Sequence, residues 1–143
     1  MPATPLDRVY FPLRLCYGLV PIVAGADKFF NLLTDWSQYL PAFVAQALPV
    51  SPDAFMRVVG IIEIVAGLAV LAILPRLGAY VVAIWLVLIA LTVGAGGDYD
   101  IAVRDLVMAL GAYTLGTVAG LRGETLLPDW IRPKGAALAA HHS

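Results

Sequence analysis

A single carboxylate, Glu63, lies inside an apolar stretch of the chain, residues 58–74 (VVGIIEIVAGLAVLAIL). A charged side chain in the hydrocarbon core of a membrane is costly unless it is paired, protonated or in contact with water, so such a residue indicates a functional site. Ser51 and Pro52 predict the start of this helix. Glu63 then lies roughly 15 Å along it, near the middle of a core about 30 Å thick. A carboxylate at this depth could exchange protons with a ligand.

Several other charged residues occupy positions from which they could reach Glu63. Its first candidates for a basic partner are Arg14 and Arg104, because a hydrogen-bonded arginine offsets much of the cost of a buried carboxylate. Lys28 is the third candidate. The residues predicted to form a quinone-binding or ion-pair network are Arg14, Lys28, Glu63, Arg104 and Asp105.

Three interpretations of this polar network are open. In the first, Glu63 or Asp27 relays protons to a quinone, whose reduction requires two protons as well as two electrons. In the second, the network binds a polar substrate that enters from outside the cell. In the third, the ion pairs only fix how the helices align. Glu63 and Asp27 are therefore the candidate catalytic residues.

The composition places the chain in a membrane. Of its 143 residues, 61% are hydrophobic and 13% are charged, whereas soluble domains carry about 25% charged residues. The net charge of −1 offers no basic surface for nucleic acid. The one cysteine excludes an internal disulfide, and the two histidines stand near the end of the chain. We therefore expect no covalent cofactor and no metal, and a quinone is the cofactor that the polar network could serve.

Hydropathy and turn residues predict an all-α fold, an integral membrane four-helix bundle in a single domain over residues 1–143. Trp36 and Tyr39 suit the headgroup region and predict a short interfacial helix between the first two spans, which could cover the mouth of the bundle. The third span has Trp85 at its middle and no charge beyond Arg76, so we interpret it as the most purely structural helix. The predicted segments are spans over residues 9–30, 53–74, 76–96 and 101–120, an interfacial segment over residues 36–48 and a polar tail over residues 121–143.

Glycines share helix faces with the charged residues. In the first span, Gly18 and Gly25 fall on the same stripe as Arg14 and Lys28. In the second, glycines lie three residues before Glu63 and four residues after it. Small residues let neighbouring helices approach closely. The residues predicted to serve helix packing are Gly18, Gly25, Gly60 and Gly67.

The distribution of basic residues predicts the orientation in the membrane. Four spans place both termini on one side, together with the loop between the second and third spans. That side receives six of the nine basic residues, and the other side receives Lys28, Arg57 and Arg104. Basic residues favour the cytoplasmic side. We therefore expect a multi-pass protein of the cytoplasmic (inner) membrane of a bacterium, with both termini in the cytoplasm.

Several short motifs occur in a recognisable order: Arg14-(x)3-Gly18, Gly25-Ala26-Asp27-Lys28, Gly60-Ile61-Ile62-Glu63-(x)3-Gly67, Arg76, and Arg104-Asp105-Leu106. This order resembles the DoxX family of small bacterial and archaeal membrane proteins, over roughly residues 8–120. The resemblance implies a four-helix membrane bundle. It also implies a link to thiosulfate:quinone oxidoreductase or to complexes that handle thiol and oxidative stress. Arg14, Lys28, Glu63 and Arg104 would be the shared polar residues.

The resemblance gives a leading function and two alternatives. The leading one is a small component of a quinone-linked redox membrane system, whose electrons would need a partner redox subunit. The second is a non-enzymatic scaffold or accessory subunit. The third is small-molecule binding or transport by a homo-oligomer. A quinone site predicts a lipid-accessible apolar groove that ends at Glu63. A scaffold predicts an enclosed, ion-paired Glu63 without a cavity, and a transporter predicts a wet path from residues 98–105.

Overall fold

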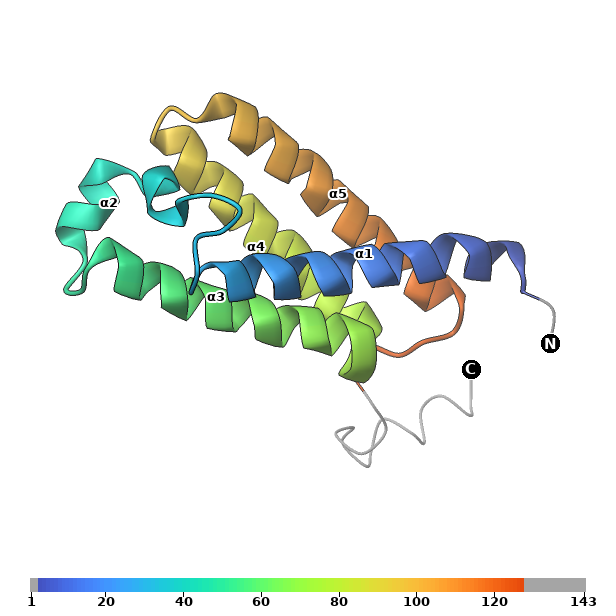
Figure 1. The fold of residues 1–143 in the computed structure, drawn as a ribbon. Coiled ribbons are helices and arrows are strands. Elements are labelled where there is room, and N and C mark those ends of the chain that lie inside the picture. Colours follow the sequence, from blue (N-terminus) through green and yellow to red (C-terminus); the bar gives the residue numbers. More distant parts are fainter. Residues whose placement is uncertain (1–2, 128–143) are drawn as a thin grey trace, which may run out of the picture.

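The chain folds into helices, which confirms the all-α prediction. The computed structural model describes residues 3–127, so the predicted polar tail lies outside the described residues beyond Leu127. Four helices are long and apolar enough to cross a membrane. In chain order (Figure 1), the elements are α1 (Pro5–Asp27), the 3-10 helix η1 (Trp36–Tyr39), α2 (Ala42–Ala47), α3 (Pro52–Leu68), the π-helix η2 (Ala69–Ile73), α4 (Pro75–Ala95) and α5 (Tyr99–Leu121).

Local capping determines where the first two long helices begin. Thr4 Oγ1 accepts the backbone N–H of Asp7, and the carboxylate of Asp7 accepts the backbone N–H of Thr4. This capping box starts α1 at Pro5, four residues before the predicted start of the span. Ser51 caps α3 as expected, because its hydroxyl oxygen accepts the backbone N–H of Ala54 at 3.2 Å. The predicted interfacial segment is divided into η1 and α2.

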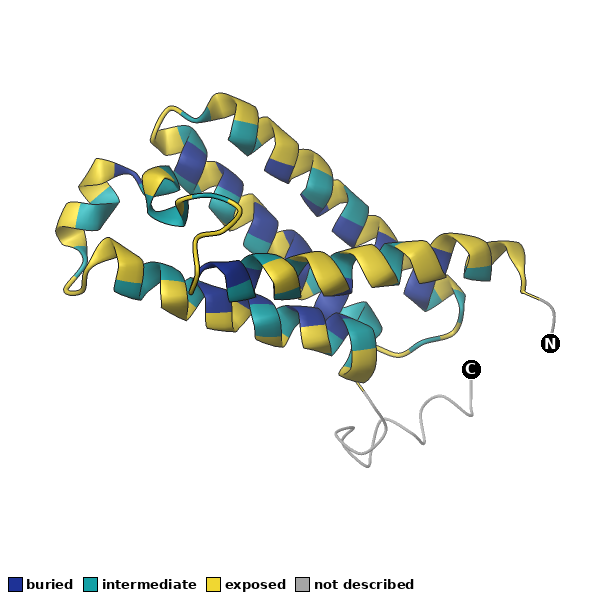
Figure 2. Cartoon of the chain, viewed as in Figure 1, coloured by how far each residue is buried: buried dark blue, intermediate teal, exposed yellow. Residues whose placement is uncertain are grey.

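The four long helices form two antiparallel pairs, α1 with α3 and α4 with α5 (Figure 1). The two pairs meet where α1 begins and α5 ends, which we call the terminal end of the bundle. They diverge toward the opposite end, the loop end, where η1 and α2 lie. Exposed positions run along the outward faces of the helices (Figure 2). Many of these positions carry large apolar side chains, and these faces contact lipid.

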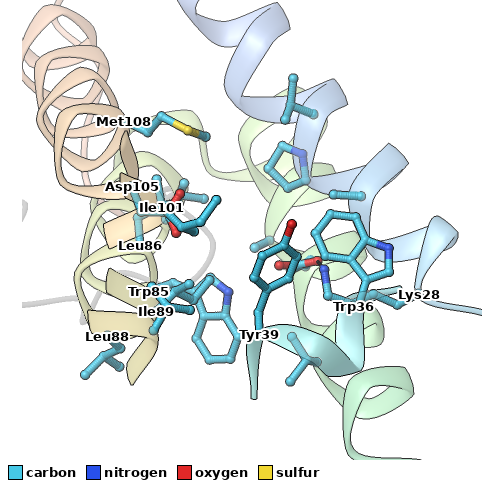
Figure 3. Close-up of a pocket in the computed structure, with 18 of the residues that line it drawn as sticks. Lys28, Trp36, Tyr39, Trp85, Leu86, Leu88, Ile89, Ile101, Asp105 and Met108 are labelled. Carbon is cyan, nitrogen blue, oxygen red and sulfur yellow. Dashed lines mark hydrogen bonds and ion pairs between the residues drawn. The ribbon is translucent and has the colours of Figure 1, made fainter. Parts of the chain in front are cut away.

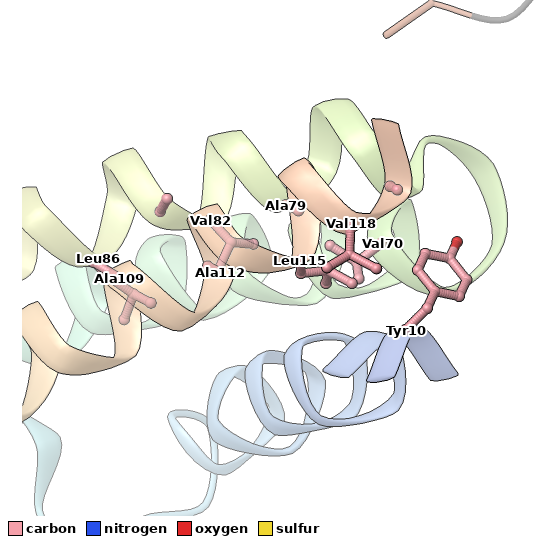
Figure 4. Close-up of a cluster of buried hydrophobic side chains, with 11 residues drawn as sticks. Tyr10, Val70, Ala79, Val82, Leu86, Ala109, Ala112, Leu115 and Val118 are labelled. Atoms are coloured by element: carbon pink, nitrogen blue, oxygen red, sulfur yellow. The ribbon is translucent and has the colours of Figure 1, made fainter. Parts of the chain in front are cut away.

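The buried core joins the two pairs near the terminal end (Figure 4). Its largest fully buried side chains are Tyr10, Leu115 and Val70, from α1, α5 and η2. The ring of Tyr10 has no exposed surface, and its hydroxyl donates to Glu124 at 2.8 Å. The Arg122 guanidinium lies 3.8 Å from the centre of the same ring and 2.9 Å from the Asp7 carboxylate. These contacts tie the start of α1 to the residues after α5, so the terminal end is closed.

Glycines set the close contact between α1 and α3. A Cβ atom at Gly25 would lie 2.5 Å from the carbonyl oxygen of Gly60, and a Cβ at Gly60 would lie 2.5 Å from that of Gly25. About two helical turns further toward the terminal end, a Cβ atom at Gly67 would meet the carbonyl oxygen of Gly18. Neither backbone can move away without opening the pair. Any side chain larger than hydrogen therefore separates the two helices.

This contact predicts that Gly60→Ala destabilises the protein by about 1–3 kcal/mol, because the methyl group forces the helices apart. Gly94→Ala is the matched control, because a Cβ there meets only Ala102 at an ordinary 3.4 Å. Alanine is also the better helix former, so the control should be neutral or stabilising. Thermal unfolding in detergent measures both variants. Equal midpoints for Gly60→Ala and the parent protein would show that the contact does not limit stability.

Candidate functional site

Glu63 forms a buried ion pair with Lys28. The Lys28 ammonium donates to the Glu63 carboxylate at 2.7 Å. Both residues are buried, with 7% of Lys28 and 8% of Glu63 exposed. The first-choice partners predicted from the sequence, Arg14 and Arg104, are therefore wrong, and the third candidate is the partner. Charge-assisted hydrogen bonds of this length are among the stronger polar contacts in proteins.

The register of α1 against α3 explains why Arg14 does not reach Glu63. Gly18 packs against Gly67, so Arg14 faces the helix about eight residues past Glu63, roughly 12 Å along its axis. The guanidinium there donates to the carbonyls of Val70, at 3.0 Å, and Leu71. Both carbonyls belong to the π-helix η2. Carbonyls at the end of a helix lack partners within it, and Arg14 supplies one.

Arg104 is held by the residue beside it in the sequence. Its guanidinium lies 3.4 Å from the Asp105 carboxylate, and 61% of its side chain is exposed. Asp105 itself is buried, with 4% exposed. The predicted network is therefore divided. Lys28 and Glu63 form one pair between α1 and α3, Arg104 and Asp105 form another within α5, and Arg14 belongs to neither.

Asp27 organises the loop that follows α1. Its carboxylate accepts the backbone N–H groups of Leu32 and Leu33, at 2.9 and 3.0 Å, and the indole N–H of Trp36 at 2.8 Å. The Trp36 ring in turn covers the Lys28 ammonium, 3.8 Å from the ring centre. We call residues 31–40 the lid. The three donors on the Asp27 carboxylate make it an anchor for this lid, and the proton relay predicted for Asp27 stays a prediction.

A cavity of about 830 Å³ lies between the two helix pairs, beneath the lid (Figure 3). Its walls come from α1, the lid, α3, α4 and α5, and most of the lining side chains are apolar. The volume falls in the range of small-molecule sites. Lys28, Trp36 and Tyr39 lie on one side in Figure 3, and Trp85 and Asp105 lie on the other. Glu63 also lines the cavity.

The cavity opens sideways, through the faces of the bundle that contact lipid. Leu19, Val20 and Val23 of α1 and Leu88 of α4 line it, and all of them are also exposed on the outside. Lid residues, Trp36 and Tyr39 among them, close it at the loop end. An apolar molecule dissolved in the membrane could therefore enter between the helix pairs.

Within residues 3–127, no three histidine, cysteine, aspartate or glutamate side chains gather as metal ligands.

Three aromatic residues of the site were not identified from the sequence. Trp36 and Tyr39 were assigned to the membrane interface, and Trp85 to a structural helix. Trp85 lines the cavity, and its indole nitrogen is buried without a hydrogen-bond partner in the described part of the chain. The sequence does contain one signal that Trp85 belongs to a site. Its indole N–H lies at the middle of an apolar helix, and a buried tryptophan usually has a hydrogen-bond partner for this group.

The buried pair predicts a specific pattern of stability. Lys28→Met leaves Glu63 as an unpaired buried carboxylate and should destabilise the protein by about 3–5 kcal/mol. The double variant Lys28→Met, Glu63→Leu removes both charges and should recover most of that loss. A double-mutant cycle on thermal unfolding midpoints measures the coupling. Additive effects of the two substitutions would contradict a direct pair.

The anchor at Asp27 predicts a loosened lid in Asp27→Asn. The amide has one acceptor oxygen where the carboxylate uses two, so at least one of the three hydrogen bonds is lost together with the charge that strengthens the others. Amide hydrogen exchange of residues 31–40 should accelerate about tenfold, while exchange in α4 and α5 stays as in the parent protein. Asp35→Asn is the control, because the Asp35 carboxylate accepts only from Ser37, within the lid itself, and does not tie the lid to α1. A uniform acceleration over the whole chain would indicate global destabilisation instead.

The comparisons with known proteins agree with the sequence motifs. The DoxX family profile matches residues 9–95, which include Lys28, Glu63 and the glycines between α1 and α3. The match ends with α4, so it does not cover Asp105. No curated protein and no solved structure matches the chain. With more than half of its length matched and four helices able to span a membrane, this chain belongs to the DoxX family of membrane proteins.

Proposed function

We propose that the protein is a small component of a quinone-linked redox system in the membrane, and that its cavity binds the quinone ring. The observation that carries this proposal is an apolar cavity, reachable from lipid, that contains the buried Lys28–Glu63 pair. A quinone combines an apolar tail with a ring that carries oxygens. The apolar walls suit the tail, and the ion pair suits a ring oxygen.

The pair has the chemistry that quinone reduction needs. The Lys28 ammonium has three N–H groups, and only one donates to Glu63. Another can donate to a quinone oxygen and stabilise the negative charge that forms there when electrons arrive. Glu63, once it has itself taken up a proton, can pass that proton to the oxygen. Two electrons and two protons convert the quinone to its hydroquinone.

The electrons must come from a partner. The chain has a single cysteine, so a thiol pair within it cannot supply two electrons by forming a disulfide. A partner redox subunit that oxidises a thiol or thiosulfate is the source that the family resemblance suggests. In this proposal the DoxX chain holds the quinone and its protons, and the partner delivers the electrons.

We place the protein in the cytoplasmic membrane of a bacterium with both termini in the cytoplasm. Six of the nine basic residues fall on the side of the two termini, and basic residues favour the cytoplasmic side. The lid and the cavity then lie toward the outer half of the bilayer. A substrate-oxidising partner would dock from the periplasmic or extracellular side.

A structural role is the second candidate, and one observation favours it. The Lys28–Glu63 contact is short and buried, and Trp36 covers it, as expected for a pair that only holds helices in register. A scaffold or accessory subunit would keep such a pair and would bind no ring in the cavity. The cavity itself is what favours the quinone.

Quinone binding can be measured through the protein's own fluorescence. Two of its three tryptophans, Trp36 and Trp85, line the cavity, and quinones quench indole emission. In lipid nanodiscs, with Trp130→Phe as the background, a short-tailed ubiquinone or menaquinone should quench saturably. Lys28→Met should weaken binding about tenfold, since it removes a charged hydrogen-bond donor.

Arg57→Met is the matched control, because Arg57 is exposed and lies outside the cavity. It should bind the quinone as the parent protein does. Quenching that rises linearly with quinone concentration in every variant would reflect partition into lipid. In that case the quinone proposal fails and the scaffold role stands.

A further inference from the structure

The α4–α5 side of the cavity carries two polar groups, Trp85 and Asp105, that lie near Glu63 but form no hydrogen bond with the Lys28–Glu63 pair. Trp85 on α4 has a buried indole N–H without a partner among residues 3–127. Asp105 on α5 is buried and lines the same cavity. Figure 3 shows both on the wall that faces Tyr39 and Lys28. A buried N–H donor without a partner is unfavourable, so this position suits a ligand atom that accepts a hydrogen bond.

Asp105 also has bonding capacity to spare. Both of its hydrogen bonds come from Arg104, both reach Oδ1, and both are long at 3.4 Å. Oδ2 accepts no hydrogen bond from the described residues. By contrast, Lys28 approaches Glu63 at 2.7 Å, and Asp27 accepts three hydrogen bonds from its loop. Of the three buried carboxylates, Asp105 is therefore the one best able to bind a ligand.

We infer that Trp85 and Asp105 bind a second ring oxygen, opposite the oxygen at Lys28, and so select rings that carry oxygens at both ends. The Trp85 N–H donates to this oxygen in the quinone. The Asp105 carboxylate accepts from the hydroxyl in the hydroquinone, because an ionised carboxylate only accepts. This inference rests on the proposed function and adds the residues that determine ligand specificity.

The position of Arg104 extends the inference to proton exchange. Its side chain is 61% exposed and contacts the buried carboxylate of Asp105. The pair therefore reaches from the cavity toward the surface at the loop end of α5. As the quinone is reduced, a proton from water there has a short route to Asp105, which can pass it to the second ring oxygen, whereas Glu63 is covered by Lys28 and Trp36. The two carboxylates would thus serve the two ring oxygens.

The test compares three ligands with the same alkyl tail: a 1,4-benzoquinone, its hydroquinone, and a phenol whose single ring oxygen enters the Lys28 side. Affinities are measured in nanodiscs by quenching and by displacement of the bound quinone. The parent protein should prefer either two-oxygen ring to the phenol about tenfold, the value of one good hydrogen bond to a ring oxygen. Trp85→Phe should lose the preference for the quinone over the one-oxygen ring. Asp105→Asn should lose the preference for the hydroquinone over the one-oxygen ring. In Trp85→Phe, the remaining Trp36 reports binding.

Asp100→Asn is the matched control, because Asp100 lies on α5 but is exposed and outside the cavity. It should keep the full preference. The ratio of the two-oxygen to the one-oxygen affinity is the decisive measurement, since a variant that only loosens the fold weakens all three ligands alike. An unchanged ratio in both Trp85→Phe and Asp105→Asn overturns the inference. An equal loss of affinity for both kinds of ring also overturns it, because it would mean that the Trp85 N–H interacts with Glu63 rather than with the ligand.

The failure of this inference differs from the failure of the proposed function. If the quinone binds saturably, and its affinity depends on Lys28 but not on Trp85 or Asp105, only the inference about these two residues is wrong. If no ring of either kind binds saturably, the quinone function fails, and the inference fails with it. Trp85→Phe changes no charge, so it keeps the test informative even if Asp105→Asn does not fold.

Discussion

The buried ion pair between Lys28 and Glu63 is the contact on which the structure of this membrane protein depends. A carboxylate near the middle of a bilayer cannot stay ionised alone, because the hydrocarbon solvates it poorly. The ammonium of Lys28 reaches it at 2.7 Å. That reach requires α1 and α3 to lie almost backbone to backbone, which Gly25 and Gly60 allow. The ion pair and the glycines therefore depend on the same close approach of α1 and α3.

The same pair connects the helices to the lid. Trp36 covers the Lys28 ammonium with its ring and donates its indole N–H to Asp27, the neighbour of Lys28 in the sequence. Two adjacent residues at the end of α1 therefore hold one tryptophan through two different contacts. A cation against an aromatic face gains strength when both are removed from water. The lid is positioned by the site that it covers.

The two ends of the bundle have different roles because they are packed differently. At the terminal end, Tyr10 is fully buried, and Arg122 and Glu124 hold it between α1 and the residues after α5. At the loop end the helix pairs separate and leave a cavity of about 830 Å³. The closed end keeps the pairs aligned, and their separation at the other end leaves the space that the lid covers. The polar groups of the cavity lie on both pairs, so a ligand with two oxygens could bridge them.

Hydropathy and helical spacing are local properties of a chain, so they predict the class of this protein, its four apolar helices, the glycines on their contact faces and a carboxylate within the second span. The partner of Glu63 was decided only by the tertiary structure. Arg14 and Lys28 share a stripe of α1, and only the register against α3 shows that Lys28 reaches the carboxylate while Arg14 bonds to the carbonyls of η2. The anchoring of the lid by Asp27 and the wall formed by Trp85 and Asp105 likewise combine segments far apart in the chain. Local patterns do not contain such distances, since how two helix pairs converge and diverge depends on packing along their whole length.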